Sequence, residues 1–359
     1  MTTSPRLVNY PTPSAFLRAC LPFDTWHMNI SLGPTLQYLA DSGDFQPAPG
    51  EAKLWLAVWT GEQLDLTLVR TSKLVTLCSP LHSSFLSQAY LEPRMTLLAE
   101  SLHALITSRS QPPLSTLTGP TTLVQAFVPA YRALSSLQPR EPAVIHTLHT
   151  HCPSSRVSPA PPLPEGYQIR PVKPGDPRSL EALAHMLLDF RNLYHGPWPA
   201  LSLVQAREHA EEAVRLGEVL VYVVPSSSGE EGEEFTGFVR DGRLTRRFAA
   251  VRNVFTRPSF RRRGVAEALT RAAVLRLLGE PHRLATLVAP LLSPGEAEQE
   301  GKRKVEEVCI FAEDSNLSAQ GIYGRVGFGF PCGDWGDKER DSGEGEKSWE
   351  ECVEVAYPE

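Results

Sequence analysis

The stretch 254-VFTRPSFRRRGVAEALTRAAV-274 joins a strand pattern to a helix pattern through three consecutive arginines and a glycine. Residues 247–256 before the turn have the apolar character of a strand, and Pro258 cannot continue a strand ladder. An apolar stripe at helical spacing follows, made by Val265, Ala268, Leu269, Ala272 and Leu275. The stretch therefore predicts a strand, a tight basic turn and an amphipathic helix.

This turn has the composition of an anion site. The first backbone N–H groups of a helix have no partner inside the helix and lie at the positive end of its dipole. A glycine lets the main chain approach a phosphate closely, and arginines add charge-assisted hydrogen bonds. The turn Arg261–Ala266 thus predicts a pyrophosphate cradle, although an arginine triplet alone is also typical of a solvated basic loop. Neither G-x-x-x-x-G-K-S/T nor G-x-G-x-x-G occurs in the chain.

At these residues the sequence resembles the GNAT superfamily of N-acetyltransferases. The family's acyl-CoA motif, Q/R-x-x-G-x-G/A between a strand and a helix, is matched by Arg261-Arg262-Arg263-Gly264-Val265-Ala266. The segment 312-AEDSNLSAQGIYGRVGF-328 is similar to the family's second motif, in which Asn opens a helix and Tyr precedes a Gly-Phe pair. The resemblance covers about residues 167–359.

The order of elements agrees with that resemblance. The patterns predict helices at 179–193 and 202–217, strands at 218–224, 235–241 and 247–256, the helix after the turn, a strand at 305–313, a helix from Asn316 to Gly327, and a strand at 349–357. This is an α/β (α+β) arrangement. The resemblance implies a GNAT-like mixed, twisted sheet flanked by helices.

The length of 359 residues favours two domains. Residues 151–166, rich in proline and serine, are predicted to link a domain at 1–150 to a GNAT domain at 167–359. The first half repeats the rhythm of strands and helix at 53–60, 63–70, 73–81 and 95–108. It is predicted to be a GNAT-like degenerate copy of the fold or an accessory domain. It lacks a phosphate turn, because no glycine lies between Gly61 and Gly119.

The resemblance implies how acetyl-CoA is bound. In this family two parallel strands splay apart around the pantetheine arm, which implies cofactor contacts from Asn253, Val254, Phe255 and Thr256. The N–H near Val254 or Phe255 would polarise the thioester carbonyl. The second motif implies further contacts from Asn316 and Ala319, and Asn316 is also expected to be the N-cap of its helix.

Tyr323 is the expected catalytic residue. The leaving thiolate needs a proton, and a phenol with a reference pKa of about 10 is a suitable donor. Tyr323 also belongs to an apolar stripe with Ala319, Ile322 and Val326, so the alternative is a core tyrosine. Four acidic residues remain open as general base: Glu306, Glu307, Glu313 and Asp314.

Composition excludes other classes of protein. Residues 331–359 carry ten acidic and three basic residues, which is a net charge of −7, whereas the whole chain has a net charge of −6. The remaining residues are therefore nearly neutral, and their charge gives no indication of nucleic-acid binding. No apolar run is long enough to span a membrane, and the six scattered cysteines suggest reduced thiols in a cytoplasmic protein. The run 146-HTLHTHC-152 is interpreted as exposed histidines, and no metal site is expected.

These observations predict an acetyl-CoA-dependent N-acetyltransferase in which an amine attacks the thioester directly. The acceptor is a small molecule or a peptide that the sequence does not identify. The alternative function is a non-catalytic module that binds acyl-CoA as a structural or regulatory ligand.

Overall fold

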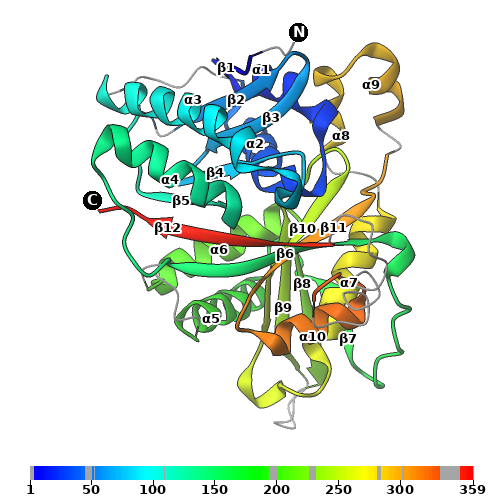
Figure 1. The fold of residues 1–359 in the computed structure, drawn as a ribbon. Coiled ribbons are helices and arrows are strands. Elements are labelled where there is room, and N and C mark those ends of the chain that lie inside the picture. The colour runs from blue at the N-terminus through cyan, green and yellow to red at the C-terminus, as the bar shows by residue number, and fades with distance from the viewer. Residues whose placement is uncertain are drawn as a thin grey trace.

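The computed structural model describes residues 4–44, 51, 53–108, 110–193, 200–225, 232–280, 284–300, 303–331 and 348–358, without the side chains of residues 285, 286, 294, 299 and 300. One twelve-stranded sheet runs through the described residues (Figure 1). From one edge to the other its strands are β1 (Arg6–Asn9), β2 (Leu54–Thr60), β3 (Gln63–Arg70), β4 (Leu74–Cys78), β5 (Thr116–Pro120), β12 (Trp349–Ala356), β6 (Ile145–Pro153), β11 (Glu307–Glu313), β10 (Phe248–Thr256), β9 (Glu233–Gly242), β8 (Val219–Pro225) and β7 (Gln168–Pro171).

The sheet contains the same pattern of strands twice. Strands β1 to β4 are joined by antiparallel pairs, and β4 then pairs with β5 in parallel. Strands β7 to β10 are likewise antiparallel, and β10 pairs with β11 in parallel. The two halves of the chain therefore build half-sheets of the same order and direction. The predicted mixed sheet flanked by helices is confirmed.

The two half-sheets are joined by an exchange of strands. β6, from the end of the first half, pairs with β11 of the second half from Glu307↔Pro153 to Glu313↔Thr147. β12, from the end of the chain, pairs with β5 of the first half and with β6. Residues 151–153 of the predicted linker are thus the end of β6, and the boundaries drawn at 150 and 167 do not divide the sheet.

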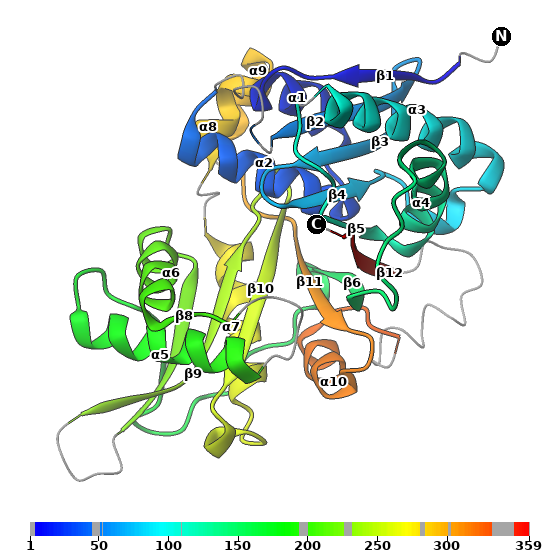
Figure 2. The same cartoon turned by 90° about the vertical axis from the view of Figure 1, so that its left-hand side faces the viewer.

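Helices cover both faces of each half-sheet, as Figure 2 shows with one half above the other. In the first half, α3 (Gln88–Thr107) and α4 (Thr121–Ser135) pack on one face, and α1 (Pro13–Cys20) and α2 (Asn29–Ser42) pack on the other. In the second half, α7 (Val265–Gly279) and α10 (Leu317–Val326) face α5 (Pro177–Leu193) and α6 (Leu203–Arg215) across the sheet. Two short helices, α8 (Ala285–Val288) and α9 (Pro294–Glu300), follow α7.

The elements predicted for the second half are confirmed, with one error in the buried face of α7. Leu275, predicted to be part of the apolar stripe, is 42% exposed, whereas Ala273, Val274 and Leu277 are buried. α7 packs against the sheet and also against α10, and its buried face includes Val265 and Leu269 of the predicted stripe but not Leu275. No helix formed by the described residues is long and apolar enough to cross a membrane.

Candidate active site

The parallel strands β10 and β11 part in the middle of the second half. They are paired only from Phe248↔Glu307 to Val251↔Ile310. Beyond this point β10 stays paired with β9 as far as Thr256, and β11 stays paired with β6 as far as Glu313. The facing edges of the two strands are therefore free of ladder hydrogen bonds and border a gap.

A bulge in β10 lies where the strands part. The β9–β10 register shifts between Val251 and Asn253, which leaves Arg252 as the extra residue and bends the strand. Beyond the bulge, Arg257 N–H donates to Thr236 O over 2.9 Å. Because hydrogen-bonded pairs alternate in an antiparallel ladder, Phe255 and Asn253 also bond to β9. Val254 and Thr256 then direct their N–H and C=O groups into the gap.

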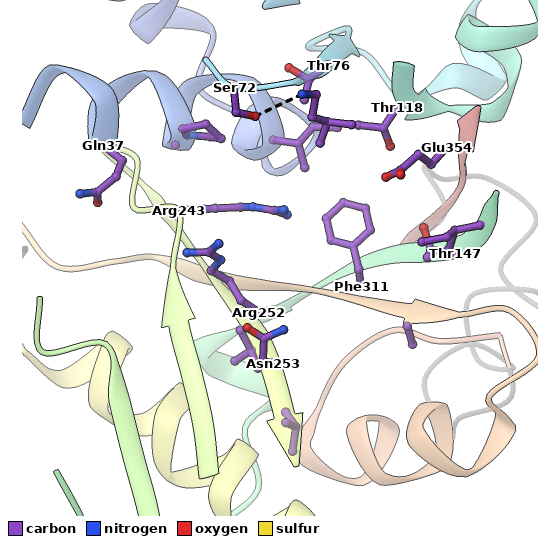
Figure 3. Close-up of a pocket in the computed structure, with 18 of the residues that line it drawn as sticks. Gln37, Ser72, Thr76, Thr118, Thr147, Arg243, Arg252, Asn253, Phe311 and Glu354 are labelled. Atoms are coloured by element: carbon purple, nitrogen blue, oxygen red, sulfur yellow. Dashed lines mark hydrogen bonds between the residues drawn. The ribbon is translucent and has the colours of Figure 1, made fainter. Parts of the chain in front are cut away.

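A cavity of about 730 Å³ opens from this gap into the first half of the molecule (Figure 3). Its walls come from β10, β11 and α10 on one side and from α2, β4 and β5 on the other. β6 and β12, the exchanged strands, contribute Thr147 and Glu354. Both halves of the chain are therefore needed to close the cavity.

Five of the predicted site residues line this cavity: Asn253, Val254, Asn316, Ala319 and Tyr323. Phe255 lies on the opposite face of the strand, where its ring packs 5.8 Å from Phe238 and 6.1 Å from Phe190. Since the backbone of Phe255 also bonds to β9, the geometry favours Val254 as the N–H that faces the gap. Thr256 is half-buried, and its Oγ1 has no hydrogen-bond partner.

The arginine turn forms an open helix start. Gly264 is the N-cap of α7, with φ 79° and no side-chain cap, and Arg262 also has a positive φ of 61°. A Cβ built on Gly264 would meet no atom within 4 Å, and Arg261, Arg262 and Arg263 are exposed. Val265 is 4% exposed and anchors the helix against the sheet, and Ala266 is half-buried beside it. The start of α7 therefore has no side-chain cap, and open space lies beside Gly264.

Asn316 begins α10 in the predicted way, because its Oδ1 accepts a hydrogen bond of 3.0 Å from Ala319 N–H. Tyr323, on the same side of the helix as Ala319, is only 9% exposed and packs 6.1 Å from the Phe330 ring. Burial raises the pKa of the Tyr323 phenol. The side chain is thus both part of the core and part of the cavity wall, and it is protonated at neutral pH.

The structure separates the four acidic candidates. Glu306 pairs with Arg247 at 2.8 Å, and Glu307 pairs with His151. Asp314 is exposed and is not among the residues that line the cavity. Glu313, the last residue of β11, is half-buried and does line it. Of the four, only Glu313 lines the cavity.

Sequence reasoning missed Arg243, which follows β9 and reaches toward the Phe311 ring in Figure 3. Its guanidinium carbon lies 5.6 Å from the centre of that ring. Burial, and then the charge of Arg252, lower the pKa of Arg243 to about 10, so the group stays charged at neutral pH. The sequence 241-DGRLTRR-247 contains no signal that separates this arginine from its neighbours.

The histidines of residues 146–152 were expected to be exposed, but one of them is buried. His149 is 1% exposed and stacks on Phe311 with ring centres 4.0 Å apart. Burial lowers its pKa. The expectation is wrong because β6 is an interior strand of the sheet, so every second side chain points into a packed layer. Among the described residues, no group of three or more His, Cys, Asp or Glu side chains could hold a metal ion.

Comparisons with known proteins find likeness of fold only. No family model and no curated protein matches the chain. Among solved structures, a tandem GNAT protein from the clavulanic acid biosynthesis pathway is 14% identical, with 98% of each chain covered and a TM-score of 0.47. A GCN5-related N-acetyltransferase from Sphaerobacter thermophilus is 15% identical, with 97% of this chain and 94% of that chain covered and a TM-score of 0.49.

A Drosophila protein is 12% identical, with 96% of this chain and 94% of that chain covered and a TM-score of 0.50. The structures that resemble this chain over nearly its whole length thus include GNAT acetyltransferases, one of them a tandem GNAT protein.

Proposed function

We propose that the protein moves an acetyl group from acetyl-CoA to an amine by direct attack in a ternary complex. The observation that carries this proposal is the gap between β10 and β11, which lies next to the open start of α7 and leads into a cavity. The turn would then hold an anion, the slot is bordered by backbone groups that make no ladder hydrogen bonds, and the cavity would hold the acceptor.

The residues of the turn fit the pyrophosphate of acetyl-CoA. The space above Gly264 is open, and the adjacent N–H groups lack a side-chain cap. Arg261, Arg262 and Arg263 would add charge-assisted hydrogen bonds, while Val265 and Ala266 offer first-turn N–H groups. Acetyl-CoA supplies the acyl thioester as the electrophile. Asn253, Asn316 and Ala319 would line the slot for its arm, and the Val254 N–H would polarise the thioester carbonyl.

Two side chains are assigned to the proton transfers of the reaction. Tyr323 keeps its proton at neutral pH and would donate it to the departing thiolate. Glu313 would accept the proton that the amine loses on attack, because this residue lines the same cavity. The reaction therefore needs no covalent link between the acetyl group and the protein.

A second candidate function is a non-catalytic module that binds acyl-CoA. The packing of Tyr323 against Phe328 and Phe330 favours it, because a tyrosine that serves only the core would look the same. The two functions differ in whether the phenol reaches a substrate in the cavity, and thus in whether thiol is released.

The test is calorimetric titration of acetyl-CoA into the wild type and Gly264→Glu, with thiol release followed against a panel of amines. This substitution would place a carboxylate in the anion site and force a side chain on a residue with φ 79°. Gly175→Glu is the matched control, since Gly175 has φ 77°, open surroundings and a place between β7 and α5. We expect binding to be lost in Gly264→Glu alone and thiol release with at least one amine. Binding without release favours the non-catalytic module, and no binding in the wild type refutes both.

A further inference from the structure

Arg243 differs from the other arginines around the β9–β10 turn. Arg240 pairs with Glu218 at 2.8 Å, Arg246 with Glu296 at 3.0 Å, and Arg247 with Glu306 at 2.8 Å. Within the described part of the chain, the Arg243 guanidinium makes no hydrogen bond and no ion pair. It lies on the ring face of Phe311, inside the cavity proposed to hold the reactants. The charge of Glu354 acts on this guanidinium across the cavity, but no carboxylate of the described residues lies within ion-pair distance of it.

The first half of the chain holds Arg243 in place through its backbone. Arg243 has φ 46°, a conformation that residues other than glycine rarely adopt. Its carbonyl accepts a 2.7 Å hydrogen bond from Nδ2 of Asn29, a buried residue at the start of α2. One turn later, Gly33 is so close that an added Cβ would lie 2.8 Å from the Arg243 carbonyl. Strain of this kind persists only where surrounding structure maintains it, and it concentrates at functional sites.

The charges of the cavity select the kind of anion. Two further arginines, Arg191 and Arg252, line the cavity. Arg252 approaches Glu218 to 3.9 Å, and Asp41 approaches Arg215 to 3.9 Å. Glu313 and Glu354 face the same cavity as Arg243. These two carboxylates, close to the Arg243 guanidinium, would repel a phosphate dianion. They suit a molecule that carries one carboxylate and one amine, because the planar guanidinium binds a carboxylate through two parallel hydrogen bonds.

We propose that Arg243 binds a carboxylate carried by a reactant, and that the acceptor is a small amine bearing this carboxylate. This inference rests on the proposed acetyl transfer. A cavity of about 730 Å³ is of the size that holds small molecules. The carboxylate at Arg243 would leave the amine directed toward the gap and Glu313. A dicarboxylic acyl group on CoA could supply the same carboxylate, so the experiment separates the two sources.

The experiment compares amino acids with their carboxamides as acceptors in the wild type, Arg243→Gln, Arg243→Lys and the control Arg246→Gln. Arg246 lies on the same turn but pairs with Glu296 and does not line the cavity. We expect the wild type to prefer the carboxylate form of at least one acceptor. Arg243→Gln should raise KM for that form roughly 10- to 100-fold, with KM for the carboxamide unchanged. Arg243→Lys should raise this KM by a smaller factor, since lysine keeps the charge but not the paired hydrogen bonds.

Calorimetry with acetyl-CoA makes the outcomes distinguishable. Unchanged acetyl-CoA affinity in Arg243→Gln shows that the variant is folded and that the lost interaction is with the acceptor. If that variant does not fold, the KM values of Arg243→Lys decide instead. Equal use of carboxylate and carboxamide by the wild type overturns the proposal, even though acetyl transfer itself then stands.

A parallel reaction replaces acetyl-CoA with succinyl-CoA and uses amines without a carboxylate. If Arg243→Gln impairs only this reaction, the carboxylate belongs to the acyl group and the proposed acceptor is wrong. If the wild type transfers no acyl group to any amine, the proposed function fails, and this inference fails with it.

Discussion

The two halves of this protein have the same strand order, yet in the described residues the helix after the fourth strand has a side-chain cap in the first half and none in the second. In the second half, β10 leads through the arginine turn to α7, whose N-cap is Gly264 without a side-chain hydrogen bond. In the first half, β4 leads to α3, whose N-cap Ser87 accepts a hydrogen bond from Tyr90 N–H. A side chain of the protein thus occupies the position that an anion could take in the other half.

The gap between the parallel strands shows the same contrast. In the first half, β4 and β5 stay in contact beyond their last pair, Thr76↔Thr118, because Gly119 packs against the Leu77 carbonyl. In the second half, β10 and β11 part after Val251↔Ile310. One topology therefore gives a gap between the parallel strands in one half and closely packed strands in the other. The difference lies in a few residues at the strand ends rather than in the fold.

The largest effect should come from a substitution at the start of α7, compared with one at the start of α3. Gly264→Glu should weaken acetyl-CoA binding by more than about 100-fold, which corresponds to roughly 3 kcal/mol. Ser87→Ala should cost about 1 kcal/mol of stability through loss of the cap and leave acetyl-CoA affinity unchanged. Calorimetry and thermal unfolding measure both. A loss of affinity in Ser87→Ala would mean that the first half also takes part in cofactor binding.

Tyr323→Phe should lower kcat about 100-fold with little change in acetyl-CoA affinity, since only the proton donor is removed. The first half has no phenol at the matching place, because Phe127 follows its helix cap at the same interval of seven residues. Tyr357→Phe is the control: Tyr357 is also a buried tyrosine, and its hydroxyl has no hydrogen-bond partner. Steady-state thiol release gives the comparison.

The raised pKa of Tyr323 also sets the alkaline limit of the reaction. A proton donor must keep its proton, so deprotonation of Tyr323 should not lower kcat below about pH 10. A decline of kcat with an apparent pKa near 8 that disappears in Tyr323→Phe would contradict this assignment.

The contact between the two halves should depend on pH. Asp24 of the first half accepts a hydrogen bond of 2.9 Å from Arg247 N–H of the second half, and burial raises the pKa of Asp24 to about 7. The folded protein therefore holds this proton more tightly than the unfolded chain does. The resulting stabilisation is complete below about pH 4 and is lost as the pH rises through 7.

Between pH 5 and pH 8 the contribution of Asp24 to the free energy of unfolding should fall by about 2 to 3 kcal/mol. Asp24→Asn should remove this part of the pH dependence, as urea unfolding at several pH values would show. The same slope in Asp24→Asn and in the wild type would assign the effect to another group.

The smallest expected effect concerns the close contact between β4 and β5 at Gly119. Gly119→Ala should destabilise the protein by about 1 to 3 kcal/mol, because its Cβ would lie 2.2 Å from the Leu77 carbonyl. Gly279→Ala at the end of α7, where a Cβ meets nothing within 4 Å, should be neutral or slightly stabilising. An equal effect of the two substitutions on thermal unfolding would show that β4 and β5 are not tightly packed there.

The sequence by itself determined the parts of the site that depend on neighbouring residues. The turn Arg261–Ala266, the N-cap Asn316 and the helical strip with Ala319 and Tyr323 are recognisable because capping, glycine conformation and helical spacing act within a few residues. The elements of the second half could be predicted for the same reason.

Only the tertiary structure decided what completes the site. The exchange of β6 and β12 leaves no mark in the composition of either strand, and it buries His149, which a linear reading places at the surface. The position of Arg243 depends on Asn29, 214 residues away in the chain. Contacts over such separations arise from the packing of whole half-sheets against one another, and no local pattern of residues encodes them.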